Sequence, residues 1–469
     1  MKKQSVALAL AVLFTGSISA QVQLPDTPAG RQLSAWLEAF NSGDHARLDR
    51  LRETLHPTMD VAREMRFREL TGGFELRAVE ASEPTALSGI FQEKDSDQFG
   101  RFTIEVEAEA PHSIKAMGIR AIPRPAEFPL PAMSEGDLLQ ALRAKLETSA
   151  AAGRFAGAVL VAKNGEVLFS EAYGLADRAK QAPNTVDTRF RIGSMNKMFT
   201  ATAVLQLVQV GKIQLSDPLG KYLTDYPNQE LATKATIHHL LSHTGGTGDI
   251  FGPEYRAHRQ ELRTLDDYLK LYGGRAPEFD PGGKWAYSNY GMVLLGAVIE
   301  RVSGMSYYDY VAKYVYEPAG MIRSGSEPEA EAVSGRAIGY TKGPEGSEWA
   351  PNTDTLPYRG TSAGGGYSTV GDLLRFANAL LSHKLLDAEH TELLITGKAE
   401  TPWGGRYAYG FEDGRKEGMG YVGHGGGAPG MNGDLKIYPY SGYVVVVLAN
   451  LDPPAAQRIS SFLDLRLPQ

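Results

Sequence analysis

The sequence predicts an α+β protein with a small α+β domain followed by a larger domain, in which an antiparallel sheet is flanked by helices and joined to a helical subdomain. Three observations support this prediction. Residues 31–70 have helical periodicity, and alternating apolar and charged residues follow them, as in half-solvated antiparallel strands. A proline-rich stretch, 123–133, then interrupts both patterns. In the part of the chain after this stretch, strand patterns lie near both ends and helical patterns lie between them.

Length and composition limit the classes of protein to consider. A chain of 469 residues is too long for one ordinary domain, and 42% hydrophobic with 22% charged residues is typical of globular proteins. The net charge of -7 argues against a general nucleic-acid binder. Cysteine is absent, which excludes disulfides, a catalytic thiol, a thiolate metal site and a lipoprotein anchor.

Residues 1–20 are predicted to be a signal peptide. Residues 1–3 are basic, residues 6–14 are apolar but too few to span a bilayer, and residues 17–20 supply small side chains for cleavage after Ala20. The alternative interpretation of this segment is an uncleaved membrane anchor. No later stretch has 18 consecutive apolar residues, so we expect a periplasmic or secreted protein with no membrane span in the mature chain.

Residues 25–122 are predicted to form the small domain. Trp36, Leu37 and Phe40 recur at helical spacing, which indicates helices in the first half. Strand patterns fill the second half, at 74–80, 102–109 and 113–122. Helices first and sheet second is an order that resembles an NTF2-like domain. The prolines of 123–133 resist both helix and sheet, so this segment is expected to be a semi-rigid linker.

Residues 134–469 are predicted to form the larger domain. It opens with a helix at 137–151 and a hairpin that turns at Asn164-Gly165. It closes with strands at 434–438 and 443–450 and a terminal helix. The strands from both ends are expected to join in one antiparallel sheet, with the helical block between them in sequence.

The Ser-x-x-Lys motif of this chain is Ser194-Met195-Asn196-Lys197, at the start of an apolar stretch typical of a helix. Residues i and i+3 share a helix face, so the spacing places an amine beside a hydroxyl at a helix N-terminus. A serine hydroxyl becomes a useful nucleophile only when a base takes its proton. The motif therefore indicates a Ser/Lys pair for acyl transfer, although the same spacing also arises by chance.

Two further segments supply groups that such a pair needs. Tyr287-Ser288-Asn289 offers a phenol that can move a proton and an amide that can bind a carbonyl or orient the lysine. His424-Gly425-Gly426-Gly427 precedes the closing hairpin, and glycines at a strand edge allow close approach of a ligand. The N–H of Gly427 is expected to form an oxyanion hole with that of Ser194. A third segment, 362–368, is interpreted as a loop that shapes the pocket.

The order Ser-x-x-Lys, Tyr-x-Asn, His-x-Gly resembles the serine β-lactamase/penicillin-binding-protein-like hydrolases, in particular their class C-type branch with its esterases and D-amino-acid peptidases. The likeness covers about 156–454. It implies a β-lactamase/transpeptidase-like fold, with Ser194 as the acylated nucleophile and Lys197 and Tyr287 as acid and base. It also implies that Asn289 positions Lys197 and the substrate amide, while His424 and Gly426 occupy the third motif.

The third motif departs from the family pattern, because most members have a lysine where this chain has His424. An unperturbed imidazole has a pKa near ~6.5 and is mostly neutral at pH 7, so substrate carboxylates are expected to bind less well here unless an arginine reaches the site. We therefore expect an acyl-enzyme hydrolase of esters, amides or D-aminoacyl peptides. β-Lactamase or DD-carboxypeptidase activity, and a non-catalytic binding or sensor module, are the alternatives.

Two alternative interpretations, an α/β-hydrolase site and a metal site, have less support. Gly360-Thr361-Ser362-Ala363-Gly364 matches the Gly-x-Ser-x-Gly of α/β-hydrolases, with Asp413 and His424 following, but no buried strand precedes it. His238-His239 is interpreted as packing rather than as metal ligands. No metal or other cofactor is expected, and the expected partner is a small-molecule or peptide substrate. The oligomeric state is left open.

Overall fold

The computed structural model describes residues 22–343 and 348–468, so the expected signal peptide, 1–20, lies outside the described residues. Contacts within the chain separate two compact units, Met1–Pro129 and Leu130–Gln469. The division falls inside the proline-rich stretch 123–133.

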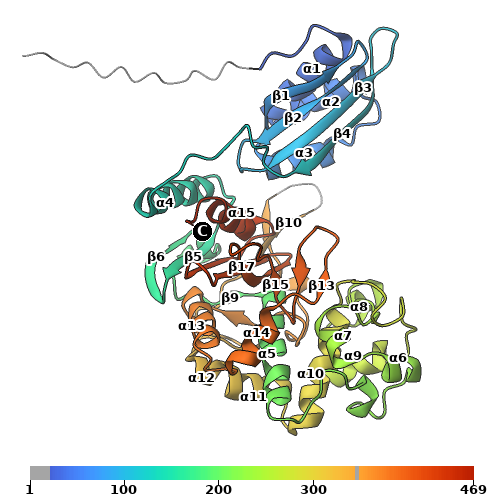
Figure 1. Cartoon of the computed structure of the whole chain (residues 1–469). Helices are drawn as coiled ribbons and strands as arrows, with labels where there is room; N and C mark the ends of the chain where they lie inside the picture. Colours follow the sequence, from blue (N-terminus) through green and yellow to red (C-terminus); the bar gives the residue numbers. More distant parts are fainter. Residues whose placement is uncertain (1–21, 344–347, 469) are drawn as a thin grey trace, which may run out of the picture. The chain divides into compact units, whose positions relative to one another are not determined.

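The first unit has helices followed by a four-stranded antiparallel sheet in the order β1-β2-β3-β4 (Figure 1). Its elements are α1 (Pro28–Ser42), α2 (His45–Thr54), α3 (Val61–Thr71), β1 (Phe74–Ser82), β2 (Ala86–Glu93), β3 (Phe99–Val106) and β4 (Ile114–Ile122). Trp36 stacks on Phe40 and Phe91, which joins α1 to the sheet. The expected order of helices before sheet is confirmed. Strand β2 was not expected, because its central Gly89 weakens the strand pattern.

The second unit is built on an eight-stranded antiparallel sheet in the order β13-β14-β15-β16-β17-β18-β5-β6. Its strands are β5 (Gly157–Lys163), β6 (Glu166–Tyr173), β13 (Ala399–Glu400), β14 (Arg406–Tyr407), β15 (Glu412–Asp413), β16 (Val422–Ala428), β17 (Met431–Tyr438) and β18 (Tyr443–Ala449). The β18–β5 pairing, with Val447 opposite Val159, joins the two ends of the unit as the sequence predicted. The two-residue strands β13–β15 are too short to leave a periodic signal.

Both faces of this sheet are buried, which explains the continuous apolar runs of β5 and β18. Val159 and Val447 face one side, where they pack with Leu142 of α4 (Glu135–Ala151) and Ile459 of α15 (Ala455–Asp464). Alternate residues of the same strands face the opposite side and pack against α5 (Asn196–Gln209) and α13 (Val370–Leu381). The sheet therefore forms the middle layer of three.

The remaining elements surround or extend this layered core. The helices are α6 (Gln229–Lys234), α7 (Ile237–Leu241), α8 (Pro253–His258), α9 (Leu265–Tyr272), α10 (Asn289–Ser303), α11 (Tyr307–Val311), α12 (Glu317–Ala319), α14 (Ala388–Ile395) and the short turns η1 (Gly193–Met195), η2 (Leu219–Lys221), η3 (Ala312–Tyr316) and η4 (Thr353–Thr355). The small strands are β7 (Leu175–Asp177), β8 (Ala182–Pro183), β9 (Phe190–Arg191), β10 (Tyr340–Lys342), β11 (Trp349–Pro351) and β12 (Tyr367–Ser368). Helices α6–α9 lie to one side of the sheet, as a helical subdomain (Figure 1).

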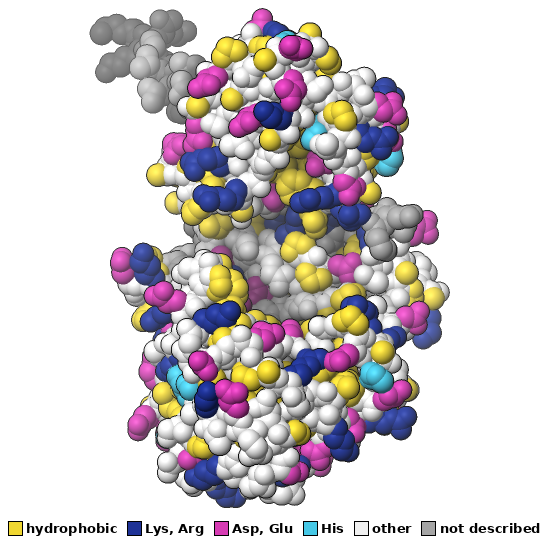
Figure 2. All heavy atoms as spheres, turned by 90° about the vertical axis from the view of Figure 1, so that its right-hand side faces the viewer, with side chains coloured by type: hydrophobic (Ala, Val, Ile, Leu, Met, Phe, Trp, Pro, Cys, Tyr) yellow, Lys and Arg dark blue, Asp and Glu magenta, His cyan; other side chains and the backbone are white. Residues whose placement is uncertain are grey.

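Acidic and basic side chains are interspersed on the visible face of each unit (Figure 2). Among residues 22–343 and 348–468, no helix is both long and apolar enough to cross a membrane.

Candidate active site

Ser194 lies in a tight turn between β9 and α5. Strand β9 pairs with β12, with Arg191 opposite Tyr367, and the chain then turns through Gly193 with a φ of +54°. Glycine adopts this left-handed conformation without steric cost. A methyl group on Gly193 would lie 3.1 Å from the backbone nitrogen of Gly427, which is a tight contact. The turn presents Ser194 at the start of α5.

Lys197 is fully buried on the first turn of α5, beside the serine. Its Nζ donates to Ser194 Oγ at 3.1 Å, to Asn289 Oδ1 at 2.7 Å and to the carbonyl of Ala363. Burial lowers the Lys197 pKa to about 7, and the charge of Asp249 opposes this effect. A substantial fraction of the amine is therefore neutral near pH 7, and a neutral amine can accept the serine proton.

Tyr287 lies against the same amine. The Lys197 Nζ is 4.7 Å from the centroid of the Tyr287 ring. Lys197 belongs to α5, whereas Tyr287 lies just before α10. Ser288 caps α10 by accepting a hydrogen bond from the Gly291 N–H, so Tyr287 immediately precedes this helix and Asn289 begins it. Burial raises the pKa of Tyr287, and a hydrogen bond with Ser194 opposes this rise. The phenol is therefore protonated at neutral pH.

Asn289 is oriented by an acidic residue that has no motif around it. Its Nδ2 donates to Oδ1 and Oδ2 of Asp249, at 3.0 and 3.1 Å. These contacts direct the amide oxygen toward Lys197. The sequence did not indicate a role for Asp249. Its role depends on a contact with Asn289, which is 40 positions away, and such a contact leaves no local pattern.

His424 lies on β16 and is 4% exposed. Its Nε2 is 3.0 Å from the hydroxyl of Tyr407. Burial, followed by the nearby charge of Lys197, lowers the His424 pKa to about 3. The sequence predicted a neutral imidazole at pH 7 from its ordinary pKa, and the structure supplies a stronger reason, which is the loss of solvent around the ring.

The glycines after His424 allow β16 to approach the serine turn. A methyl group on Gly426 would lie 2.0 Å from the carbonyl oxygen of Ile192, which is a severe clash with backbone. The backbone nitrogen of Gly427 lies next to Gly193, the residue before Ser194. Strand β15 pairs with β16 at Val422 and Gly423. Past that pairing, the edge of β16 packs against the turn η1 that carries the serine.

His243 also belongs to this cluster. Its ring lies between the rings of Tyr287 and Tyr407, with centroid distances of 4.5 Å to each. The Nδ1 atom accepts a hydrogen bond from the Ser288 N–H at 3.3 Å, so the proton of the neutral ring is on Nε2. Burial lowers the His243 pKa well below its ordinary value. His243 thus packs against the Tyr287 ring and helps to hold it in place.

The adjacent histidines have packing partners. His239 Nδ1 accepts from the N–H of Thr236 at 3.3 Å in a capping box, and His238 Nδ1 is 2.7 Å from the Tyr409 hydroxyl. Within the part of the chain that the structure describes, no group of three or more His, Cys, Asp or Glu side chains is arranged to hold a metal ion.

The alternative Ser362-Asp413-His424 triad does not form. Ser362 is fully buried, and its hydroxyl has no hydrogen-bond partner among the described residues. Asp413 is engaged by Arg406 and Arg415, at 2.9 Å each. The segment around Ser362 folds back on itself through a bridge between Thr361 and Gly364, rather than joining a strand to a helix. These contacts argue against an α/β-hydrolase site.

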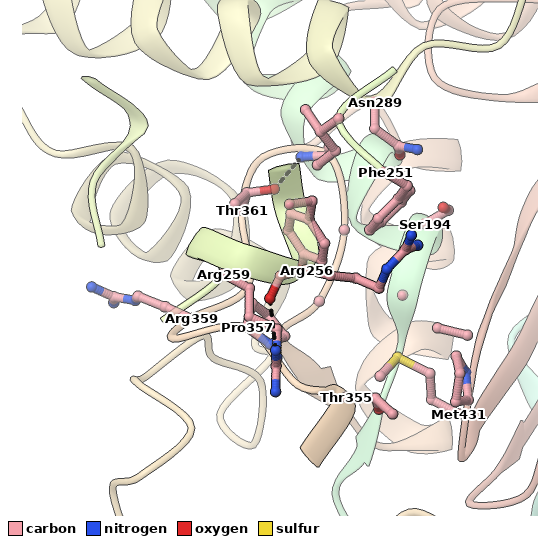
Figure 3. Close-up of a pocket in the computed structure, with 18 of the residues that line it drawn as sticks. Ser194, Phe251, Arg256, Arg259, Asn289, Thr355, Pro357, Arg359, Thr361 and Met431 are labelled. Atoms are coloured by element: carbon pink, nitrogen blue, oxygen red, sulfur yellow. Dashed lines mark hydrogen bonds between the residues drawn. The ribbon is translucent and has the colours of Figure 1, made fainter. Parts of the chain in front are cut away.

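A cavity of about 410 Å³ opens beside Ser194 (Figure 3). Apolar and aromatic side chains form much of its wall, namely Ile250, Phe251, Tyr255, Tyr268 and Met431. Asn289, Gly427 and the loop 363–365 complete the end near the serine. The nucleophile candidate therefore faces a cavity of the size that small-molecule ligands occupy, about 300–1,000 Å³.

Comparison with known proteins gives a consistent result. The family model described as "Beta-lactamase" matches residues 140–466. The chain is 32% identical over 253 residues to a "Putative penicillin-binding protein PbpX" of Bacillus subtilis (strain 168), which is 53% of this chain and 61% of that protein. It is 36% identical over 227 residues to "Esterase EstB" of Burkholderia gladioli, which is 45% of this chain and 57% of that protein.

A solved structure shows the likeness over more of the chain. The crystal structure of a penicillin binding protein from Bacillus halodurans aligns with a TM-score of 0.63 and 34% identity, over 68% of this chain and 99% of that one. By contrast, the chain spans only 61% and 57% of the two curated relatives above.

Proposed function

The chain belongs to the beta-lactamase family, and from this premise we propose that it is a serine hydrolase in which Ser194 forms an acyl-enzyme with ester or amide substrates. One observation carries the proposal. A fully buried lysine with a pKa of about 7 lies 3.1 Å from the hydroxyl of Ser194. The arrangement combines a nucleophile with a base that is partly neutral at physiological pH.

In the acylation step, neutral Lys197 takes the proton of Ser194 as Oγ forms a bond to the substrate carbonyl carbon. The carbonyl oxygen becomes an oxyanion, which the N–H groups of Ser194 and Gly427 stabilise. When the intermediate collapses, the bond to the leaving group breaks, and the leaving group receives a proton through Tyr287. Water then attacks the acyl-enzyme, which returns the proton to Ser194 and releases the acid.

Lys197 is assigned as the base, and Tyr287 as the proton carrier. A base must be deprotonated before the reaction. Burial favours the deprotonated form of Lys197 but the protonated form of Tyr287. It lowers the pKa of Lys197 to about 7, whereas it raises the pKa of Tyr287. The phenol therefore enters the reaction with its proton and can pass it onward.

The neutral His424 favours esters and amides whose leaving groups carry no carboxylate. The buried imidazole has no charge to offer to an anion. β-Lactams and peptides that end in a D-amino-acid carboxylate are the second candidate substrates, favoured by the penicillin-binding relatives. A non-catalytic binding module is the third candidate, but such a protein has no need of a lysine with a lowered pKa.

We also propose the domain organisation that the sequence indicates. It consists of a signal peptide at 1–20, a small α+β domain at 25–122, a linker at 123–133 and the hydrolase domain at 134–469. The division of contacts near Pro129 and the family match over 140–466 support the last boundary. The signal peptide implies export to the periplasm or beyond.

Intact-protein mass spectrometry tests the function directly. Separate samples of the folded protein are exposed to a fluorophosphonate, to p-nitrophenyl esters, to D-alanyl amides and to nitrocefin. We expect one adduct on Ser194, its absence in Ser194→Ala, and its persistence in Ser362→Ala. Turnover of an ester or amide identifies the substrate class. A folded wild-type protein that gains no adduct with any reagent would favour the binding module.

A further inference from the structure

The cavity beside Ser194 has an excess of positive charge. Three arginines line it, Arg256, Arg259 and Arg359, while Asp354 is the acidic residue among the lining side chains. An arginine remains charged throughout the physiological pH range. The excess therefore persists at every pH at which the enzyme would work, and it is independent of Lys197 and of the neutral His424.

Two of these arginines are held by the protein itself. Arg259 donates to the carbonyl of Arg256 at 2.9 Å and to the carbonyl of Asp354 at 2.5 Å. Arg359 donates to the carbonyl of Ser326, and its guanidinium stacks 3.4 Å from the centre of the Tyr308 ring. Both side chains stabilise the wall of the cavity by these contacts.

Arg256 differs from them. Its side chain is exposed, and its guanidinium makes no hydrogen bond or ion pair with any residue in 22–343 or 348–468. It belongs to the short helix α8, close in sequence to Phe251 and Tyr255 of the apolar wall. In Figure 3 its guanidinium extends toward the side of the cavity on which Ser194 lies. The group is thus a charged donor that has no partner within the protein and faces the place of the substrate.

The position of the cavity indicates which part of a substrate it would hold. Ser194, Asn289 and Gly427 line it, whereas Tyr287 and His424 do not. In the proposed mechanism, the leaving group departs on the side of Tyr287, which supplies its proton. The cavity therefore lies on the other side of the carbonyl, where the acyl group remains attached to the serine.

We propose that the acyl group of the substrate carries a carboxylate that Arg256 binds, an inference that rests on the function proposed above. A guanidinium offers parallel N–H donors that match the two oxygens of a carboxylate. Because the wall of the cavity is largely apolar and accommodates a hydrocarbon chain, the inference predicts a monoester or monoamide of a dicarboxylic acid as the substrate. A free amino group at that end would instead be repelled by the three arginines.

Two esters with the same leaving group test this inference. The p-nitrophenyl monoester of adipic acid carries a carboxylate on its acyl chain, and p-nitrophenyl hexanoate has the same chain length without charge. We expect the wild-type protein to have the higher kcat/KM for the adipate ester. Arg256→Ala should lower this value roughly 10-fold, since a hydrogen-bonded charge is lost, and leave the hexanoate value within about 2-fold. Arg256→Lys should retain part of the preference.

Lys384→Ala is the matched control, because it removes an exposed positive charge that does not line the cavity. It should leave both rates unchanged. The adipate preference should also decrease with added salt, which screens charge. Equal wild-type rates for the two esters, or an equal loss for both in Arg256→Ala, would overturn the inference while the proposed function stands. Failure of both esters together with no labelling of Ser194 would overturn the function, and the inference with it.

Discussion

The Nζ of Lys197 lies 2.7 Å from the side-chain oxygen of Asn289, and this contact connects the first turn of α5 to the first residue of α10. The other end of the amide is held by both oxygens of Asp249. The amide cannot turn over without presenting its N–H groups to the lysine. Asp249, Asn289 and Lys197 therefore form a chain of contacts that directs the amine toward Ser194.

The rate of acylation should report the deprotonation of Lys197. Because only the neutral amine can act as a base, we expect kcat/KM for an uncharged ester to rise with pH through about 7 and then to level off. Lys197→Met, which keeps the length of the side chain without its charge, should remove this rise and lower the plateau by about 10²–10⁴-fold. Stopped-flow measurements of kcat/KM across pH 5–9, for the wild type and for Lys197→Met, would test this prediction. A rise that survives in Lys197→Met would assign the base to another group.

Asp249→Asn should move this pH dependence in a defined direction. The Asp249 charge opposes the lowering of the Lys197 pKa, so its removal should lower that pKa further and shift the rise in kcat/KM to lower pH. The plateau should also decrease, by about 10-fold, as Asn289 loses its orientation. Asp225→Asn, at an exposed position shortly before α6, serves as the control. A shift to higher pH would contradict the assigned role.

Neighbouring glycines of β16 should respond differently to the same substitution. In Gly426→Ala, the new methyl group would meet the carbonyl oxygen of Ile192 at 2.0 Å, so β16 must move away from the serine turn. We expect a loss of activity and a destabilisation of about 1–3 kcal/mol. In Gly425→Ala, the first contact is the flexible side chain of Gln457 at 3.3 Å, so activity should be largely kept. Ester hydrolysis and thermal unfolding of the pair would check this, and equal effects would argue against close packing at Gly426.

Ser362→Ala should keep full activity and unfold no more easily than the wild type. The Ser362 hydroxyl is buried without a hydrogen-bond partner among the described residues, and removal of such a group costs little or stabilises by up to about 1 kcal/mol. A methyl group at Gly296 would instead lie 2.3 Å from that hydroxyl, so Gly296→Ala should destabilise the protein. Denaturant titration compares the two variants. Inactive but folded Ser362→Ala would restore the α/β-hydrolase reading.

Acidification should destabilise the fold through His424. Its folded-state pKa is about 3, while an unfolded histidine has a pKa near ~6.5. Between these values the unfolded chain binds a proton that the folded chain does not, so the free energy of unfolding decreases as pH falls, by at most about 1.4 kcal/mol per pH unit from this residue. Urea titrations at pH 7 and pH 5 should show a smaller difference in His424→Gln than in the wild type. An equal difference would mean that His424 is protonated when folded.

Sequence patterns were informative where the relevant residues are close along the chain. The hairpin β5–β6 follows from Asn164-Gly165 between two apolar runs, and Ser-x-x-Lys follows from helical spacing. The joining of β5 to β18 was also predictable, because strand patterns at both ends need partners. In the first two cases the information lies in local spacing, and in the third it lies in the need of each strand for a partner.

Contacts between individual side chains at distant positions were not predictable from the residues alone. Asp249 gives no periodic signal, and its role appears only when α10 brings Asn289 beside it. The contact of His243 with Tyr287 depends on the path of the loop before α10. The position of the Arg256 guanidinium likewise could not be predicted, since the sequence does not indicate which arginine reaches the site.

The pairing of β5 with β18 also has a consequence for synthesis on the ribosome. The central sheet cannot close until residues 443–449 have been translated, although the turn that carries Ser194 is made about 250 residues earlier. Such long-range pairing slows folding, and the apolar strands made early remain unpaired until their partners have been synthesised. The nascent chain therefore cannot complete its reactive centre until translation has almost reached the last helix, α15.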